Sequence, residues 1–228
     1  MKLKPEAARS LESSKPKRIF IVEDHPVFRC GLTHLIESEE GFSVCGHAAS
    51  FPMALDELRR VEADAAILDI GIEGANGLEL VKHLRAEHPR MKLLVVSVHD
   101  EVVYGPRALR AGAHGYVMKR ESDVMVLEAL RSVLAGKVFV SPSLGSNLLY
   151  RVAFHDNNGA GKSPIASLSD RELEVLELVG QGLGTRDIAG KLNISIKTVE
   201  CHRLHLKEKL GIANATELVR FAMQWAER

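Results

Sequence analysis

Residues 65–77 read AAILDIGIEGANG, and this stretch decides the fold of the first half of the chain. Residues 65–68 form a short apolar run, which is typical of a central strand of a parallel sheet that is covered on both faces. Asp69 then stands at the carboxyl end of that strand, the edge at which open α/β sheets bind ligands. Taken alone, Asp69 is more simply explained as a turn-forming or helix-capping residue. Burying a carboxylate without a partner costs free energy. The charged and polar residues found elsewhere in the sequence therefore decide whether Asp69 is a ligand-binding residue or a turn or cap residue.

Strand patterns and helix patterns alternate on both sides of this stretch. The sequence predicts strands over residues 18–22, 42–48, 65–69, 92–96 and 115–117. It predicts helices over residues 26–38, 52–61, 77–87, 102–111 and 124–135. Strict alternation of this kind predicts an α/β fold with a doubly wound, five-stranded parallel sheet.

The second half of the chain has a purely helical pattern. Ser169 and Glu172 form a capping box before the first helix, and further helices are expected over 185–192, from Ser195 to 210, and over 215–226. A short helix, a tight turn and a helix that begins Ser-x-Lys-Thr-Val are typical of a helix-turn-helix. We therefore expect a disordered tail over 1–16, a first domain over 17–135, a linker over 136–165 and an all-α four-helix domain over 166–228.

Composition narrows the class of protein. Apolar residues make up 46% of the chain and charged residues 26%, which describes a globular protein with no predicted membrane span, so we expect a cytoplasmic location. Residues 19–135 carry 12 basic against 18 acidic side chains, so the first domain is a poor nucleic-acid surface. Basic residues and histidines gather instead at 197–209. The three cysteines have no paired spacing and are expected to be reduced thiols.

Charged and polar side chains follow several strands of the predicted sheet. Glu23 and Asp24 follow the first strand, Asp69 the third, Ser97 the fourth and Lys119 the fifth. Three carboxylates at one rim repel one another unless a cation joins them, and hard oxygen ligands suit Mg²⁺. A hydroxyl and an ammonium facing a metal-bound carboxylate would receive a tetrahedral oxyanion. These residues predict a site that holds a phosphoryl group on Asp69.

These positions resemble those of a two-component receiver with a CheY-like fold, over about residues 17–135. The resemblance implies that Asp69 is the phosphoacceptor, loaded by a partner histidine kinase. It also implies that Asp24 binds the metal directly, that Glu23 binds it through water, and that the carbonyl of Gly71 is a further ligand. Ser97 and Tyr116 would be the paired switch residues, because Ser97 moving towards the phosphoryl group would leave space that Tyr116 fills from the surface. Lys119 would neutralise the phosphoryl charge.

The run from Leu168 to Gly211 resembles the LuxR-type (NarL/FixJ) helix-turn-helix along its whole length. The resemblance implies that the helix after Ser195 enters the major groove of promoter DNA. Its base-facing residues would be Glu200, Cys201 and Leu204; in an alternative interpretation, Glu200 is only a solvated helix position and Arg203 reads the bases. The residues placed to reach phosphates would be Lys197, Thr198, Arg203, His205 and Lys207.

Three functional interpretations compete. The first is a phosphorylation-controlled transcription regulator that binds paired DNA half-sites as a homodimer and catalyses nothing beyond the chemistry of its own phosphoryl group. The second is an enzyme, but aspartate-based phosphatases need a second acid where Gly71 stands, and EDHPVF is no dinucleotide-binding loop. A GAGKS fragment at 159–163 is followed by Pro164 and lacks the context of a phosphate-binding loop. The third keeps the DNA binder but lets the first domain work independently of phosphorylation.

Overall fold

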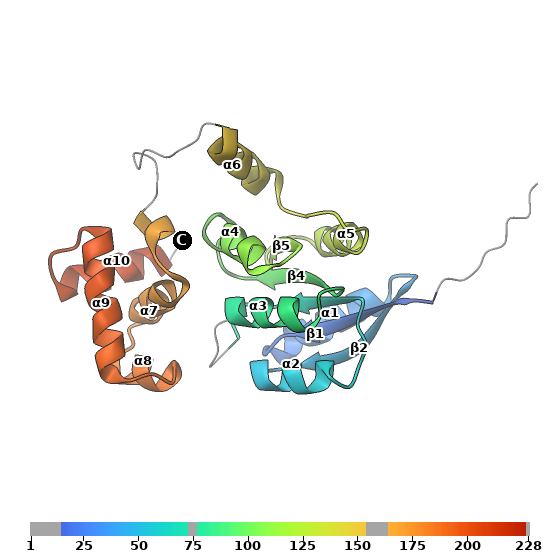
Figure 1. The fold of residues 1–228 in the computed structure, drawn as a ribbon, viewed down its shortest axis with the longest axis horizontal. Helices are drawn as coiled ribbons and strands as arrows, with labels where there is room; N and C mark the ends of the chain where they lie inside the picture. Colours follow the sequence, from blue (N-terminus) through green and yellow to red (C-terminus); the bar gives the residue numbers. More distant parts are fainter. Residues whose placement is uncertain (1–14, 73–76, 154–163, 227–228) are drawn as a thin grey trace, which may run out of the picture.

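A computed structural model describes residues 15–72, 77–153 and 164–226, so most of the expected tail and the GAGKS fragment lie outside the described residues. Its first half alternates strands and helices (Figure 1). The strands are β1 (Lys17–Val22), β2 (Phe42–Ala48), β3 (Ala65–Leu68), β4 (Lys92–Ser97) and β5 (Gly115–Met118). The helices are α1 (Pro26–Glu37), α2 (Phe51–Leu58), α3 (Gly77–Glu87), α4 (Glu101–Ala111) and α5 (Asp123–Leu134). All strand pairs are parallel, in the order β2-β1-β3-β4-β5, which confirms the predicted doubly wound fold.

Alternate residues of each strand enter different apolar layers of this domain. Ile19 and Ile21 of β1 pack with residues of α1 and α5. Phe20 and Val22 pack on the opposite face with residues of α2, α3 and α4. The four residues are fully buried, as a central strand covered on both faces requires. The sheet is thereby held rigidly between two helical layers, which fixes the loops at its carboxyl edge.

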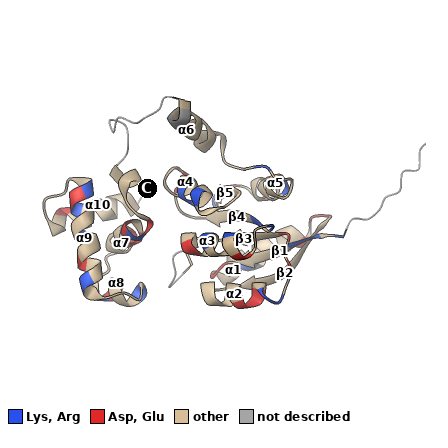
Figure 2. Cartoon of the chain, in the orientation of Figure 1, with Lys and Arg blue, Asp and Glu red and all other residues tan. Residues whose placement is uncertain are grey.

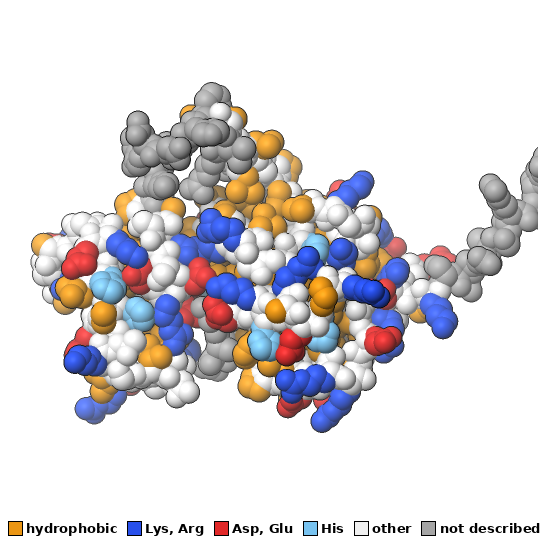
Figure 3. All heavy atoms as spheres, in the orientation of Figure 1, with side chains coloured by type: hydrophobic (Ala, Val, Ile, Leu, Met, Phe, Trp, Pro, Cys, Tyr) orange, Lys and Arg blue, Asp and Glu red, His pale blue; other side chains and the backbone are white. Residues whose placement is uncertain are grey.

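The predicted linker contains a helix, α6 (Pro142–Ala153). It packs on α4 where Leu144 fills the space left by the absent side chain of Gly105. The Ser141 hydroxyl donates a hydrogen bond to Glu101 Oε1 at 2.6 Å. Leu149 and Tyr150 remain largely exposed on α6, and the space-filling view shows apolar side chains gathered around this part of the molecule (Figure 3).

The last part of the chain is helical, as predicted. A short 3-10 helix, η1 (Pro164–Ser167), precedes α7 (Asp170–Gly180), α8 (Thr185–Lys191), α9 (Ile196–Leu210) and α10 (Ala215–Ala226). Ser169 and Glu172 form the expected capping box, in which each side chain accepts from the other's backbone amide. Ser195 caps α9 by accepting from the Thr198 amide. Within the described ranges, no helix is both long and apolar enough to cross a membrane.

Candidate functional site

Asp69 lies at the centre of a polar cluster on the carboxyl edge of the sheet. The register that pairs Leu68 with Val22 and with Val95 brings the ends of β1, β3 and β4 to the same rim. The Ser97 hydroxyl donates to Asp69 Oδ1 at 2.8 Å, and Lys119 Nζ lies 2.7 Å from Asp69 Oδ2. The carboxylate is only 3% exposed, so its charge depends on these donors rather than on water.

Lys119 is the cation that pairs with two buried acids of the rim, Asp69 and Glu23. Its ammonium also lies 2.7 Å from Glu23 Oε2, and Glu23 is 1% exposed. Burial lowers the pKa of Lys119, but hydrogen bonds and charge attraction from Asp69 and Glu23 outweigh it, so the pKa is raised overall. Lys119 Nζ also sits 4.4 Å above the ring of Phe28, which provides a further favourable contact for a cation. The lysine is therefore held positively charged against the buried carboxylates.

The rim also contains a cluster that could hold a metal ion. Ligand atoms of Glu23, Asp24, His25 and Asp69 all lie within 4.8 Å of one another. His25 was not predicted as part of the site, although it directly follows Glu23 and Asp24 in sequence; its Nδ1 lies 2.9 Å from Asp24 Oδ1. The amide of Gly71 donates to Asp69 Oδ1 at 2.9 Å. Carboxylate oxygens are the ligands that a hard cation such as Mg²⁺ prefers.

The two expected switch residues both point inward. Ser97 is fully buried with its hydroxyl on Asp69, and Tyr116 is 1% exposed. Tyr116 Oη donates to the backbone carbonyl of His99 at 2.8 Å. Burial raises the pKa of the Tyr116 hydroxyl far above its ordinary value, so it acts as a neutral donor. This inward arrangement is the one that the switch hypothesis assigns to the phosphorylated receiver.

The candidate DNA-reading helix presents its polar face outward. Val199 and Leu206 are buried against the other helices, which fixes the opposite face of α9 in solvent. Figure 2 marks basic residues along the ribbon of α8 and α9, with acidic ones among them. The exposed members of the expected set are Lys197, Thr198, Glu200, Cys201, Leu204 and His205, and the partly buried ones are Arg203 and Lys207.

Sequence reasoning did not find the residues that join the two domains. Arg107 of α4 and Glu177 of α7 both contact residues of the other domain. The one sequence signal for Arg107 is that an arginine stands within α4, a helix that otherwise packs on the sheet. No local pattern marks Glu177, because its partners are more than 70 residues away in the chain.

Comparison with known proteins identifies the class. Residues 19–131 match the model for the response regulator receiver domain, and residues 166–222 match that for bacterial regulatory proteins of the luxR family. The chain therefore belongs to the response regulators that carry a LuxR-type DNA-binding domain.

Individual relatives agree with this assignment. The chain is 33% identical to the oxygen regulatory protein NreC of Staphylococcus haemolyticus over 91% of its own length and 97% of that protein, and 32% identical to NreC of Staphylococcus aureus with the same coverage. Among solved structures, it is similar to RcsB of Salmonella enterica serovar Typhimurium bound to a promoter with the phosphomimetic BeF₃⁻. That match has 25% identity and a TM-score of 0.68, and it covers 91% of this chain and 98% of the other.

Proposed function

We propose that this protein is a phosphorylation-controlled transcription regulator in which Asp69 accepts a phosphoryl group from a histidine kinase. The observation that carries the proposal is the pair of contacts from Ser97 and Lys119 to the Asp69 carboxylate, in a chain whose other domain presents an exposed DNA-reading helix. The domain division 17–135, 136–165 and 166–228 belongs to the same proposal, as does action on promoter DNA in the cytoplasm.

Three side chains near Asp69 have roles in this proposal. A phosphoryl group on Asp69 adds roughly two negative charges. Lys119 neutralises part of that charge, and the Ser97 hydroxyl turns to donate to a phosphoryl oxygen. Tyr116, the second switch residue, donates a hydrogen bond to the carbonyl of His99. A movement of the loop between β4 and α4 therefore also moves the Tyr116 side chain.

The acidic rim fits a bound Mg²⁺. Asp24 is the proposed direct ligand and Glu23 a ligand through water; Asp69 and the carbonyl of Gly71 complete the proposed set. The three acids belong to one cluster of possible ligand atoms. When bound, Mg²⁺ neutralises charge on the transferred phosphoryl group. Ligand atoms of Glu23, Asp24 and Asp69 lie within 4.8 Å of one another, which supports a shared metal ion beside Lys119.

The DNA-binding part of the proposal assigns base contacts to Glu200, Cys201 and Leu204. Glu200 accepts from a cytosine amino group, and Leu204 contacts a thymine methyl group. The proposed phosphate contacts are made by Lys197, Thr198, Arg203, His205 and Lys207. One small module gives limited affinity, which supports binding as a homodimer to paired half-sites.

The proposal is tested by incubating the full chain with acetyl phosphate and Mg²⁺ and measuring its intact mass. Wild type is expected to gain one phosphoryl group, and Asp69→Ala none. Asp56→Ala is the matched control, because Asp56 is an exposed carboxylate on α2. Equal phosphorylation of Asp69→Ala and wild type would assign the phosphoacceptor elsewhere. A wild-type chain that takes up no phosphoryl group would favour a receiver that works independently of phosphorylation.

A further inference from the structure

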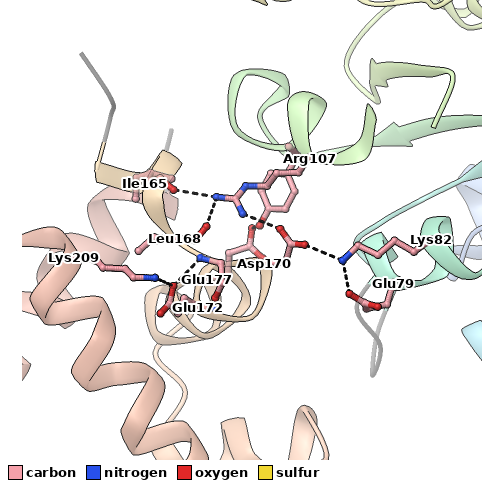
Figure 4. A network of polar contacts seen from close by, with 11 residues as sticks. Glu79, Lys82, Arg107, Ile165, Leu168, Asp170, Glu172, Glu177 and Lys209 are labelled. Carbon is pink, nitrogen blue, oxygen red and sulfur yellow. Dashed lines mark hydrogen bonds and ion pairs between the residues drawn. The ribbon is translucent and has the colours of Figure 1, made fainter. Parts of the chain in front are cut away.

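The receiver and the DNA-binding domain are docked through a buried arginine (Figure 4). The guanidinium of Arg107 on α4 donates to Asp170 Oδ1 at 2.8 Å and to the carbonyl oxygens of Ile165 and Leu168 at 3.1 and 2.7 Å. Lys82 of α3 adds a longer contact to Asp170 at 3.4 Å. Arg107 is 6% exposed, so this is an interior contact and not a surface ion pair. Buried apolar residues of the two domains also form one contiguous cluster.

A second interdomain contact lies beside the phosphoacceptor. His99, on the loop between β4 and α4, directs Nδ1 to Glu177 Oε1 of α7 at 3.1 Å. Tyr104 of α4 donates its hydroxyl to the same oxygen and stacks on the imidazole, with ring centroids 4.6 Å apart. Glu177 and Tyr104 thus fix the orientation of the His99 ring from two sides.

The other nitrogen of this ring, Nε2, lies near the same space as Asp69. A point beside Gly71, where a side chain would begin if the residue were not glycine, lies 3.3 Å from His99 Nε2 and 3.4 Å from Asp69 Oδ1. The space between the imidazole and the phosphoacceptor therefore exists because residue 71 has no side chain.

We propose that Glu177, although it belongs to the DNA-binding domain, is a positioning residue of the receiver's phosphoryl site. It holds His99 so that Nε2 meets the phosphoryl group on Asp69, and phosphorylation consequently favours the docked arrangement of the two domains. This inference rests on the proposed role of Asp69. Glu177 occupies Nδ1 and leaves Nε2 to the phosphoryl group, so the two bind His99 together and do not compete for it.

The two partners of His99 lie on different sides of its ring. Glu177 contacts Nδ1, and the space beside Asp69 opens towards Nε2. A phosphoryl group adds negative charge on the Asp69 side, where the interaction is partly shielded from water. The contact between Glu177 and His99 and the contact between His99 and the phosphoryl group therefore strengthen each other. By reciprocity, docking of the DNA-binding domain also stabilises the phosphorylated receiver.

Docking in this arrangement is compatible with DNA reading. The interdomain contacts use α3, α4 and the loop before it on one side, and the segment from η1 to α7 on the other. Lys197, Glu200 and Leu204 on α9 stay exposed. The docked state can therefore present the recognition helix, and its stabilisation by phosphorylation need not mask that helix.

The test measures docking by hydrogen exchange in the full chain, with and without BeF₃⁻ and Mg²⁺. BeF₃⁻ binding is followed separately by ¹⁹F NMR, with Asp69→Ala as the unbound reference. We expect BeF₃⁻ to slow exchange of segments 101–108 and 164–170 by at least about fivefold in wild type, the lower end of typical couplings between sites. Glu177→Gln is expected to lose most of this slowing. Glu174→Gln, on the same helix but paired with Arg171 of its own domain, is expected to keep it.

A spectroscopic measurement separates positioning from general stability. In the chain labelled with ¹⁵N-histidine, the His99 resonances are identified by their loss in His99→Gln. BeF₃⁻ is expected to shift Nε2 in wild type but not in Glu177→Gln, and Glu177→Gln alone to shift Nδ1.

The outcomes discriminate between the two proposals. Faster or unchanged exchange in wild type with BeF₃⁻ bound would overturn the coupling while leaving the proposed function intact. A Glu177→Gln variant that responds like wild type would also overturn it. Absence of bound fluoride signals in wild type would refute the proposed function, and the inference with it.

Discussion

Replacing Arg107 by alanine should undock the two domains without unfolding either one. The change removes three hydrogen bonds from a guanidinium that is 6% exposed, and leaves Asp170 and the carbonyl oxygens of Ile165 and Leu168 without that partner. Removing one partner of a buried ion pair costs about 3–5 kcal/mol, and Asp170 is 27% exposed, so solvent screening favours the lower end. A loss of about 3 kcal/mol lowers the docking equilibrium constant roughly a hundredfold.

Hydrogen exchange of residues 164–170 measures this effect, because docking covers η1 and the start of α7. Exchange there is expected to rise by up to roughly the same factor in Arg107→Ala, while the amides of the central strands keep their protection. Arg110→Ala is the matched control, since Arg110 lies exposed on the same helix. If Arg107→Ala and wild type exchanged equally at 164–170, Arg107 would not anchor the interface and the docking argument would be wrong.

Three further predictions concern local contacts. Ser169→Ala removes the hydroxyl of the capping box and should lower the free energy of unfolding of the DNA-binding domain by about 1 kcal/mol, measured by denaturant titration; an unchanged midpoint would contradict this. Burial raises the pKa of Glu172, but Lys209 and the Ser169 cap lower it more, so the folded pKa lies below the ordinary 4.5. The carboxylate therefore contributes to stability above pH 4.5, and this contribution is lost as the pH falls through the folded pKa. Glu172→Gln should make the free energy of unfolding depend less on pH in this range. An equally steep loss of stability in acid would contradict this role of Glu172. Gly105→Ala should loosen α6, because the new methyl group meets Leu144, and proteolysis within 142–150 should speed up; unchanged cleavage would show that α6 does not depend on this contact.

The sequence predicts the sheet and its rim well because both follow from local patterns. A four-residue apolar run can be recognised as a buried central strand, and parallel strands necessarily bring their carboxyl ends to one edge. The contacts of Asp69 with Ser97 and Lys119 are consistent with that reasoning.

The interdomain contacts could not be predicted in the same way. Arg107 and Asp170 are 63 residues apart, and each reads in sequence as an ordinary exposed charge on an amphipathic helix. His99 is recognisable as a residue near Asp69, but only the packing of α7 shows that its other nitrogen meets Glu177. Such pairs arise from how two finished domains fit together, which no periodicity within either domain encodes.

The most direct test of a phosphorylation-controlled regulator is the affinity for DNA with and without a phosphoryl mimic. The probe is a fluorescent promoter fragment recovered with the wild-type chain from sheared genomic DNA, and binding is followed by anisotropy at fixed salt, because phosphate contacts make affinity salt-dependent. BeF₃⁻ with Mg²⁺ is expected to tighten binding by about tenfold in wild type, within the usual range of couplings between sites, and to leave Asp69→Ala unchanged. Equal affinities of wild type in the two conditions, with BeF₃⁻ shown to be bound, would contradict the account.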